Sequence, residues 1–471
     1  MTPRQLMRHI EVLASDDFGG RAPATEGERR TIAYVAGELR RRGLEPGAPG
    51  GSWFQPVALV ERAPRTHRAR WSANGRTLAF DPERITLIGS DVAQRLTDAP
   101  VVFAGHAVVD RASGIDQLAG ADLAGAVALV LVEPPDVAGF PAYRERVRTL
   151  VEAGAAAVIG IVADDLPWDA LAAAAAPRRT ELDDALPAIS GTIAASEVAR
   201  LVAQGGGDFA ALLEEQPGPA FRAVPLNLRA TLEVASEVRR FVSSNVVGRI
   251  RGRTAGAGSV LLLAHWDHLG LCRPEGAADR ICNGAVDNAS GIAVLIEAAG
   301  RLARGRRPER DIIVLATTAE EAGLLGAEHF AARPTVPLGS IAAAINVDTA
   351  AIAGRGEPVA VTGRGVEPLD RAIAETAAAL GRRIDESGAG DRFLRRQDGW
   401  ALSRAGVPAV MLGGNFANAE LLRAYLEGRY HGPDDEVRPD LPLGGAAEDA
   451  DLIVALVRRL ADPALYQPPP R

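Results

Sequence analysis

The sequence predicts an α/β protein with a mainly parallel sheet sandwiched by helices and a smaller inserted domain rich in β-strands. From about Pro225 onward, short apolar strands alternate with loops and amphipathic helices, a pattern typical of parallel sheets with their functional site at the carboxyl ends of the strands. Between about Arg70 and Val224 the pattern is richer in short strands. At 471 residues the chain also exceeds a single hydrophobic core, so two or three domains are expected.

Composition excludes several classes of function. The net charge of -8 and the pI near 5.6 argue against nucleic acid or an anionic membrane surface as the main partner. All 52 basic residues are arginine, so Schiff-base chemistry and the phosphate-binding lysine of a P-loop are both excluded. The sequence does not indicate an oligomeric state.

No segment has the length of a membrane span, and the first residues lack the apolar core of a signal peptide. As written, the chain is expected in the cytoplasm, or to be exported if the native start lies upstream. Cys272 and Cys282 would close a small disulfide in an exported protein. In the cytoplasm free thiols are expected, and the sequence alone leaves the pairing open.

The first elements have recognisable start and stop signals. Thr2-Pro3 is a good beginning for an amphipathic helix. Thr25 and Glu28 predict a capping box for a second helix, which Gly43 ends.

The middle region shows no cluster of candidate metal ligands. Asn74-Gly75 predicts a hairpin, and Pro100 to Val109 and Ala126 to Val132 are predicted strands. His106 stands alone and is predicted to be structural. Residues 172–176 are all alanine and form a link without chemistry.

Candidate ligands follow the strands predicted after Pro225. His265 ends the apolar strand 259–264, and Asp287 opens the following helix. Glu320 and Glu321 follow the strand 311–317, and Asp348 follows the strand 341–347. Near the C-terminus, His431 lies in a predicted turn. Singly, each residue is unremarkable; together they predict one cluster at the strand edge.

Two imidazoles and three carboxylates suit two zinc ions, with one carboxylate bridging. Asp267 is better placed to hold the second ring nitrogen of His265 than to bind metal itself. Glu320 neighbours a ligand without being one, as a general base beside a metal-activated water must. Glu320 and Asp267 are therefore the predicted catalytic residues.

The order of these motifs resembles the two-zinc aminopeptidase family, which includes bacterial leucyl aminopeptidases and glutamate carboxypeptidases. The shared motifs are His-x-Asp, Gly-Ala-x-Asp-Asn-Ala-Ser-Gly, Glu-Glu-x-Gly-Leu-x-Gly, Asn-x-Asp and Tyr-His-x-Pro-x-Asp. The resemblance covers about residues 226–471 and the opening segment 18–23. The middle region is similar to the protease-associated domain that many members contain. The predicted boundaries are 1–69 and 226–471 for the peptidase domain and 70–225 for the insert.

The resemblance implies a zinc-dependent exopeptidase, most simply an aminopeptidase that removes N-terminal residues from peptides. It assigns Asp287 as the bridging ligand of two zinc ions. One ion would also bind His265 and Asp348, and the other Glu321 and His431. Glu320 corresponds to the general base, whereas His268 matches no ligand of the family.

One segment departs from the family. Many relatives have Tyr-x-Ser-Asp-His before the last strand, where this chain has residues 395–399, Arg-Arg-Gln-Asp-Gly. Asp398 is kept and is a candidate substrate-binding residue, but substrate preference cannot be carried over. Two alternatives stay open. A glutaminyl-cyclase-like acyltransferase would work with one zinc. An inactive receptor or scaffold on the same fold would have lost ligands that are intact here.

Overall fold

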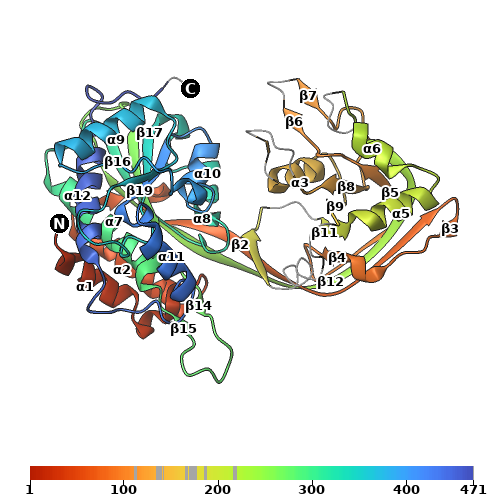
Figure 1. Cartoon of the computed structure of the whole chain (residues 1–471), viewed down its shortest axis with the longest axis horizontal. Helices are drawn as coiled ribbons and strands as arrows, with labels where there is room; N and C mark the ends of the chain where they lie inside the picture. The colour runs from red at the N-terminus through yellow and green to blue at the C-terminus, as the bar shows by residue number, and fades with distance from the viewer. Residues whose placement is uncertain are drawn as a thin grey trace. The chain divides into compact units, whose positions relative to one another are not determined.

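The computed structural model describes residues 1–110, 114–133, 140–141, 143–164, 168, 178–184, 188–215 and 220–469. The chain forms two compact units, one of Met1–Ala58 with Phe241–Arg471 and one of Leu59–Arg240 (Figure 1). Two long strands, β2 (Phe54–Ala73) and β12 (Val224–Ile250), have residues in both units. The sequence placed the corresponding boundaries at residues 70 and 225.

Unit 1 is built on a mainly parallel sheet with the strand order β18-β19-β17-β13-β16-β12. Strands β13, β16, β17 and β19 run parallel, and β12 and β18 pair antiparallel at the two ends of this order. The bounds are β13 Ser259–His265, β16 Asp311–Thr317, β17 Ile341–Asn346, β18 Ala360–Thr362 and β19 Ala409–Gly413. The predicted fold class is confirmed.

Helices cover both faces of this sheet (Figure 1). Side chains alternate along β13, so that Val260 and Leu262 pack in one cluster and Leu261 and Leu263 in the other. The first cluster includes residues of α1 (Pro3–Leu13), α2 (Glu26–Arg41), α7 (Gly291–Arg304), α9 (Glu367–Ala379), α11 (Ala419–Gly428) and α12 (Leu443–Leu460). The second includes residues of α8 (Leu325–Ala332) and α10 (Gly399–Arg404). Burial on both faces explains why every residue of β13 is buried.

The two N-terminal helices begin where the sequence predicts. Thr2 and Gln5 form a reciprocal capping box at α1. At α2 the hydroxyl of Thr25 accepts from the backbone N–H of Glu28, but the Glu28 carboxylate accepts instead from the N–H of Ala24 and the hydroxyl of Ser243. Only half of the predicted capping box therefore forms.

Unit 2 contains a second set of parallel strands. Its order is β12-β5-β8-β9-β11-β4, with β5, β8, β9 and β11 parallel and β4 antiparallel. The bounds are β4 Ile85–Ile88, β5 Ala93–Phe103, β8 Val127–Leu131, β9 Ala157–Val162 and β11 Ile189–Ala194, with helices α3 Tyr143–Glu152, α5 Ala195–Gln204 and α6 Phe209–Glu215. The predicted hairpin turns at Asn74-Gly75, both with positive φ, into β3 (Arg76–Thr77). The alanine run 172–176 lies outside the described residues.

Cys272 and Cys282 form a disulfide, which corrects the expectation of free thiols. Strands β14 (Gly270–Leu271) and β15 (Ile281–Cys282) pair antiparallel and bring the two Cα atoms to 5.7 Å, within the range that a disulfide spans. This pairing is a tertiary feature that cysteine spacing alone does not reveal. Among the described residues, no helix combines the length and apolar character needed to cross a bilayer.

Candidate metal centre

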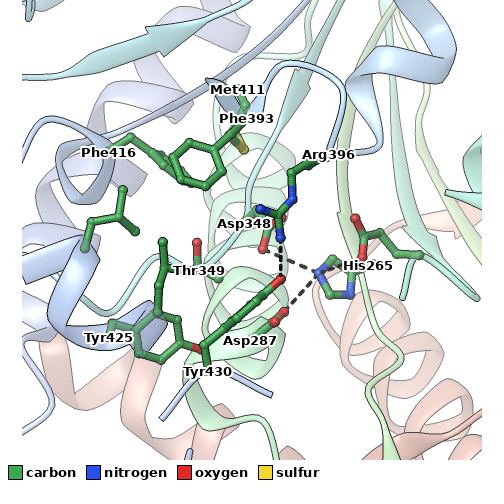
Figure 2. Close-up of a pocket in the computed structure, with 13 residues that line it drawn as sticks. His265, Asp287, Asp348, Thr349, Phe393, Arg396, Met411, Phe416, Tyr425 and Tyr430 are labelled. Carbon is green, nitrogen blue, oxygen red and sulfur yellow. Dashed lines mark hydrogen bonds and ion pairs between the residues drawn. The ribbon is translucent and has the colours of Figure 1, made fainter. Parts of the chain in front are cut away.

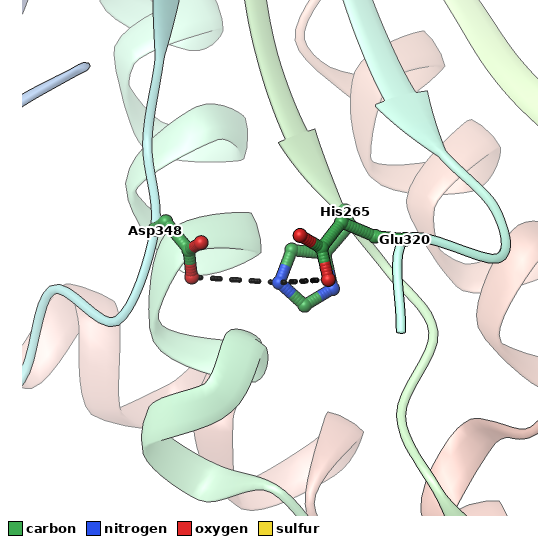
Figure 3. Close-up of side chains that lie close together, drawn as sticks. All are labelled: His265, Glu320 and Asp348. Carbon is green, nitrogen blue, oxygen red and sulfur yellow. Dashed lines mark ion pairs between the residues drawn. The ribbon is translucent and has the colours of Figure 1, made fainter. Parts of the chain in front are cut away.

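Three adjacent strand ends place the predicted polar residues together. In the parallel pairing of β13 with β16, His265 lies opposite Thr317, three residues before Glu320. On the other side of β13, Leu263 lies opposite Asn346, two residues before Asp348. Because the strands end at the same edge, the three side chains meet there, and Figure 3 shows the carboxylates of Asp348 and Glu320 facing the His265 ring.

The carboxylate of Asp287 lies between two imidazoles. Asp287 belongs to the turn 285–290 before α7, and His431 follows α11. One oxygen of Asp287 is 3.3 Å from His265 Nε2, and the other is 3.3 Å from His431 Nε2. His265 Nε2 is also 3.4 Å from Asp348 Oδ1, and His431 Nε2 is 2.9 Å from Glu321 Oε2. The five predicted ligands therefore converge in one cluster.

The cluster has the donors and the unsatisfied atoms of a metal site. His265, Glu320 and Asp348 offer ligand atoms within 4.8 Å of one another, and so do His265, Asp287 and Glu321. Asp348 Oδ1 is buried and has no hydrogen-bond partner among the described residues. Its ion-pair partner is His265 Nε2, at 3.4 Å, and a divalent cation would satisfy this buried oxygen more fully. The residues present therefore fit a metal ion.

The pKa shifts of the clustered side chains also indicate a site for cations. Burial raises the pKa of Glu320 well above its ordinary value, and the charges of Glu321 and Asp348 raise it further. Burial lowers the pKa of His431, but hydrogen bonds to Asp287 and Glu321 outweigh this and raise it to about 10. Acidic groups gathered at this density need positive charge between them, which protons or metal ions can supply.

Asp267 orients the Glu320–Glu321 segment. Its carboxylate accepts the backbone N–H of Glu320 at 3.1 Å and that of Glu321 at 3.4 Å. The sequence predicted that this carboxylate would hold the His265 ring. In the structure it lies 3.9 Å from His265 Nδ1, and the closer partner of that nitrogen is the main-chain carbonyl of Asp267, at 3.2 Å. Burial raises the pKa of Asp267 to about 7.

Two further residues, His268 and Asp435, contact the cluster in ways that the sequence did not predict. His268 is buried, and its Nδ1 lies 2.6 Å from Glu321 Oε1, so it holds a carboxylate of the cluster. Asp435 accepts the backbone N–H groups of Val286 and Asp287. His268 ends the Ala-His-Trp-Asp-His run, and this second histidine close to the predicted ligand His265 is the sequence feature from which a contact with the cluster could have been predicted.

Arg21 is a fully buried cation beneath the cluster. Its guanidinium donates to five main-chain carbonyls, those of Leu13, Trp266, Asn283, Gly284 and Asp287. Burial lowers its pKa to about 10, and Asp287 is the carboxylate that opposes this most. Arg21 thus ties the segment before α2 to Trp266, which follows His265, and to the turn that carries Asp287. The sequence shows that an arginine lies in the segment 18–23, which resembles the family, but it does not indicate which residues the arginine contacts.

Asp398, the candidate substrate-binding residue, is buried and accepts a hydrogen bond from the Thr317 hydroxyl. It is not among the side chains that line the adjoining pocket. Burial raises its pKa to about 6. Its visible contact is with the end of β16.

A cavity of about 450 Å³ opens beside the cluster (Figure 2). His265, Asp287, Glu320 and Asp348 form one wall. The rest is mostly apolar or aromatic and consists of Thr349, Phe393, Arg396, Met411, Phe416, Leu422, Tyr425, Leu426 and Tyr430. A cavity with polar groups on one side and mostly apolar or aromatic side chains on the other suits a small organic group.

The sequence model of peptidase family M28 matches residues 245–457. Residues 245–457 belong to this family. The match contains every polar residue of the cluster, and the chain is accordingly a metallo-exopeptidase. Among curated proteins, none matches the sequence.

Solved structures similar to this chain include two aminopeptidases. An aminopeptidase from Aneurinibacillus sp. strain AM-1 is 18% identical, with 100% of this chain and 96% of that chain covered and a TM-score of 0.51. BSAP, a zinc aminopeptidase from Bacillus subtilis, is also 18% identical, with coverage of 97% and 94% and a TM-score of 0.46. At these identities the first likeness establishes the fold.

Proposed function

We propose that this M28 peptidase is a zinc aminopeptidase that uses two zinc ions to release N-terminal residues from peptides. The observation that carries the proposal is the position of Asp287, whose two carboxylate oxygens face different imidazoles at equal distances. A carboxylate in this position can be shared by two cations, each with its own histidine. The names of the similar structures, which include aminopeptidases, support the substrate class.

The contacts support the ligand sets that the resemblance implies. His265 and Asp348 would complete one ion, and Glu321 and His431 the other, with Asp287 shared. Zinc supplies Lewis acidity, which polarises a peptide carbonyl and makes water more acidic. Asp267 and His268 keep Glu321 in place through its N–H and its Oε1. Such supporting contacts commonly set metal affinity.

Glu320 would act as general base and then as general acid. Its backbone is fixed by Asp267, and its Oε2 lies 3.9 Å from His265 Nε2 at the wall of the cavity. The carboxylate would take a proton from the attacking water and return it to the departing amine. Its raised pKa describes the chain without cations; nearby divalent charge would favour the ionised, basic form.

Metal content separates this proposal from its alternatives. A glutaminyl-cyclase-like acyltransferase would need one zinc ion, whereas Asp287 faces two histidines. An inactive scaffold would not need the intact set of acidic and histidine side chains that converge here. We expect about two zinc ions per chain by elemental analysis.

The activity test is a substrate panel assayed with and without a chelator. Leucine p-nitroanilide should be hydrolysed and its N-acetyl form should not, because an aminopeptidase requires a free amine. Chelation should abolish the activity and zinc should restore it. Hydrolysis of the blocked substrate at a similar rate, or activity that survives complete loss of metal, would contradict the proposal.

The cellular compartment and the role of unit 2 remain predictions. The Cys272–Cys282 disulfide favours the exported alternative over the cytoplasm, because disulfides persist in oxidising compartments. Thiol labelling of the native chain, before and after reduction, would test it.

Unit 2, predicted to be protease-associated, would shape access or partner binding, since the possible metal groups found among the described residues all lie in unit 1.

A further inference from the structure

Arg396 is a cation placed in the wall of the substrate cavity. It belongs to the segment 395–399, where the sequence departs from the family pattern. Figure 2 shows its side chain extending toward Tyr430 across the opening beside Asp348. It donates to the Tyr430 hydroxyl at 3.4 Å, and its guanidinium carbon lies 5.9 Å from the centroid of the Phe393 ring.

Most donors of Arg396 are unused. A guanidinium carries five N–H donors, and the long contact with Tyr430 employs one of them. Among the residues that the structure describes, no carboxylate lies within ion-pair distance of Arg396. Other arginines of unit 1 have such partners; Arg382, for example, pairs with Asp449 at 2.8 Å. Arg396 thus offers a charge and free donors to whatever enters the cavity.

Arg396 is exposed, and its contacts connect it to the metal centre. Tyr430, its hydrogen-bond partner, precedes His431, and the two rings stack with centroids 3.7 Å apart. On its other side, Phe393 packs against Phe416, another side chain of the cavity wall. A group bound by Arg396 would therefore lie in the same cavity as the polar cluster.

The chemistry of the guanidinium indicates which chemical group Arg396 would bind. A guanidinium matches a carboxylate through two parallel hydrogen bonds, and Arg396 is the one arginine among the side chains that line the cavity. Metal ions in the centre would add positive charge nearby, so an anion beside Arg396 would be favoured further.

We propose that Arg396 binds a carboxylate of the substrate within about one residue of the cleaved bond. The proposal rests on the peptidase function proposed above and names its substrate class. Two sources share this chemistry: the C-terminal carboxylate of a dipeptide and the side chain of an acidic N-terminal residue. Successive Cα atoms are only about 3.8 Å apart, so both lie close to the scissile bond.

Matched substrate pairs test the proposal and separate the two sources. Leucylglycine is compared with leucylglycinamide, and glutamyl p-nitroanilide with glutaminyl p-nitroanilide. In one pair the carboxylate form should have the higher kcat/KM, by about 10- to 100-fold, mainly through KM. Arg396→Gln should collapse that ratio toward one, and Arg396→Lys should keep part of it because the charge is retained.

Arg395 supplies the matched control. It is the preceding arginine, packs over Trp400 at 5.6 Å and does not line the cavity. Arg395→Gln should leave both ratios as in the parent. Equal kcat/KM values within both pairs for the parent, or an unchanged ratio in Arg396→Gln, would overturn the proposal.

A binding measurement keeps the test independent of turnover. Calorimetry of the zinc-loaded chain with N-acetylglycine and N-acetylglycinamide should show tighter binding of the carboxylate, by about tenfold or more, and Arg396→Gln should lose that difference. If no substrate is hydrolysed but this difference appears and depends on Arg396, the aminopeptidase proposal fails and the carboxylate site stands. Equal binding of the carboxylate by parent and Arg396→Gln would overturn the carboxylate site.

Discussion

The two units each contain parallel strands, and the ends of those strands are used differently. In unit 1 the residues after β13, β16 and β17 turn toward one another and form the metal centre. In unit 2, Asp164 after β9 accepts the N–H of Ser196 at 2.8 Å and its hydroxyl at 2.7 Å, in the first turn of α5. His106 after β5 is buried; burial and the charge of Arg146 lower its pKa to about 4.

This difference shows that a parallel sheet supplies the place for a site but not the chemistry. Strand ends in both units carry histidine and acidic residues. In unit 2 those described here have partners within the fold, or are held neutral by burial. In unit 1 several carboxylates face the same imidazoles, and one buried oxygen has no hydrogen-bond partner among the described residues. The convergence of more carboxylates than imidazoles is what distinguishes this strand edge of unit 1.

The largest expected effect is at Glu320. Glu320→Gln keeps the size of the side chain but removes its basic oxygen, so turnover should fall by about two to four orders of magnitude. Zinc content should stay near that of the parent, because Glu320 is not an assigned ligand. Steady-state kinetics with elemental analysis checks both. Retention of most turnover would leave Glu320 as a carboxylate that only tunes the metals.

Asp287→Ala should cause the largest loss of metal. In the proposed assignment, removal of Asp287 would weaken the binding of both ions, whereas His265→Ala, Asp348→Ala, Glu321→Ala or His431→Ala would each remove a ligand of one ion. Elemental analysis after dialysis measures the difference. Full metal occupancy in Asp287→Ala would show that the carboxylate between the two imidazoles is not a bridge.

Glu297 is a buried carboxylate of unit 1 whose charge is compensated by His9 and Arg42, and it provides a comparison with the cluster. Burial raises its pKa, but hydrogen bonds from His9 and Arg42 outweigh this and lower the pKa to about 2. Because the folded pKa is depressed, the stabilisation is present above the ordinary pKa of about 4.5 and is lost as pH falls toward 2. Glu297→Gln should therefore be less stable at pH 7, by about 1–3 kcal/mol, with a difference that shrinks below pH 4.

Denaturant unfolding at several pH values measures this, with the exposed Glu26→Gln as control. Glu26 pairs with Arg30 on the surface of α2 and should change stability by less than about 0.5 kcal/mol. A difference between parent and Glu297→Gln that grows below pH 4 would reverse the sign of the argument. Zinc content should not change in either variant.

The smallest effect is expected at Asp164 of unit 2. Asp164→Ala removes an acceptor from the first turn of α5 and should destabilise unit 2 by about 0.5–2 kcal/mol. Zinc content and kcat/KM should match the parent, because this strand end holds a helix and no metal. A loss of metal in Asp164→Ala would break the distinction between the two strand edges.

Much of the fold and of the candidate site could be predicted because it depends on local pattern. Strand β16 has the predicted bounds, and β13 and β17 differ from prediction by one residue, since strands buried on both faces are continuous apolar runs. The cluster follows from these strands, because parallel neighbours end at one edge. In unit 2, β5 begins at Ala93, seven residues before the predicted start, in a polar stretch where alternation is weak.

What the sequence did not predict depends on contacts between distant segments. Arg21 binds carbonyls of residues more than 240 positions away, and nothing local to residue 21 encodes them. The same holds for the Asp267 carboxylate, whose partners are the N–H groups of Glu320 and Glu321. Arg396 lies in a segment that departs from the family pattern, and its place in the cavity wall depends on tertiary contacts such as the one with Tyr430.

The disulfide has a consequence for how the chain tolerates damage and change. Cys272 and Cys282 close a loop whose described residues are mostly exposed, and Cys282 is followed closely by the turn that carries Asp287. A protease cut after Arg280 would leave both fragments covalently joined, and the two strands of the hairpin would stay paired. Residues inserted between Pro274 and Asp279 would likewise lengthen an external loop whose ends are already fixed. This hairpin is therefore the position at which a tag or an additional recognition loop could be grafted near the metal centre with little disturbance of its ligands.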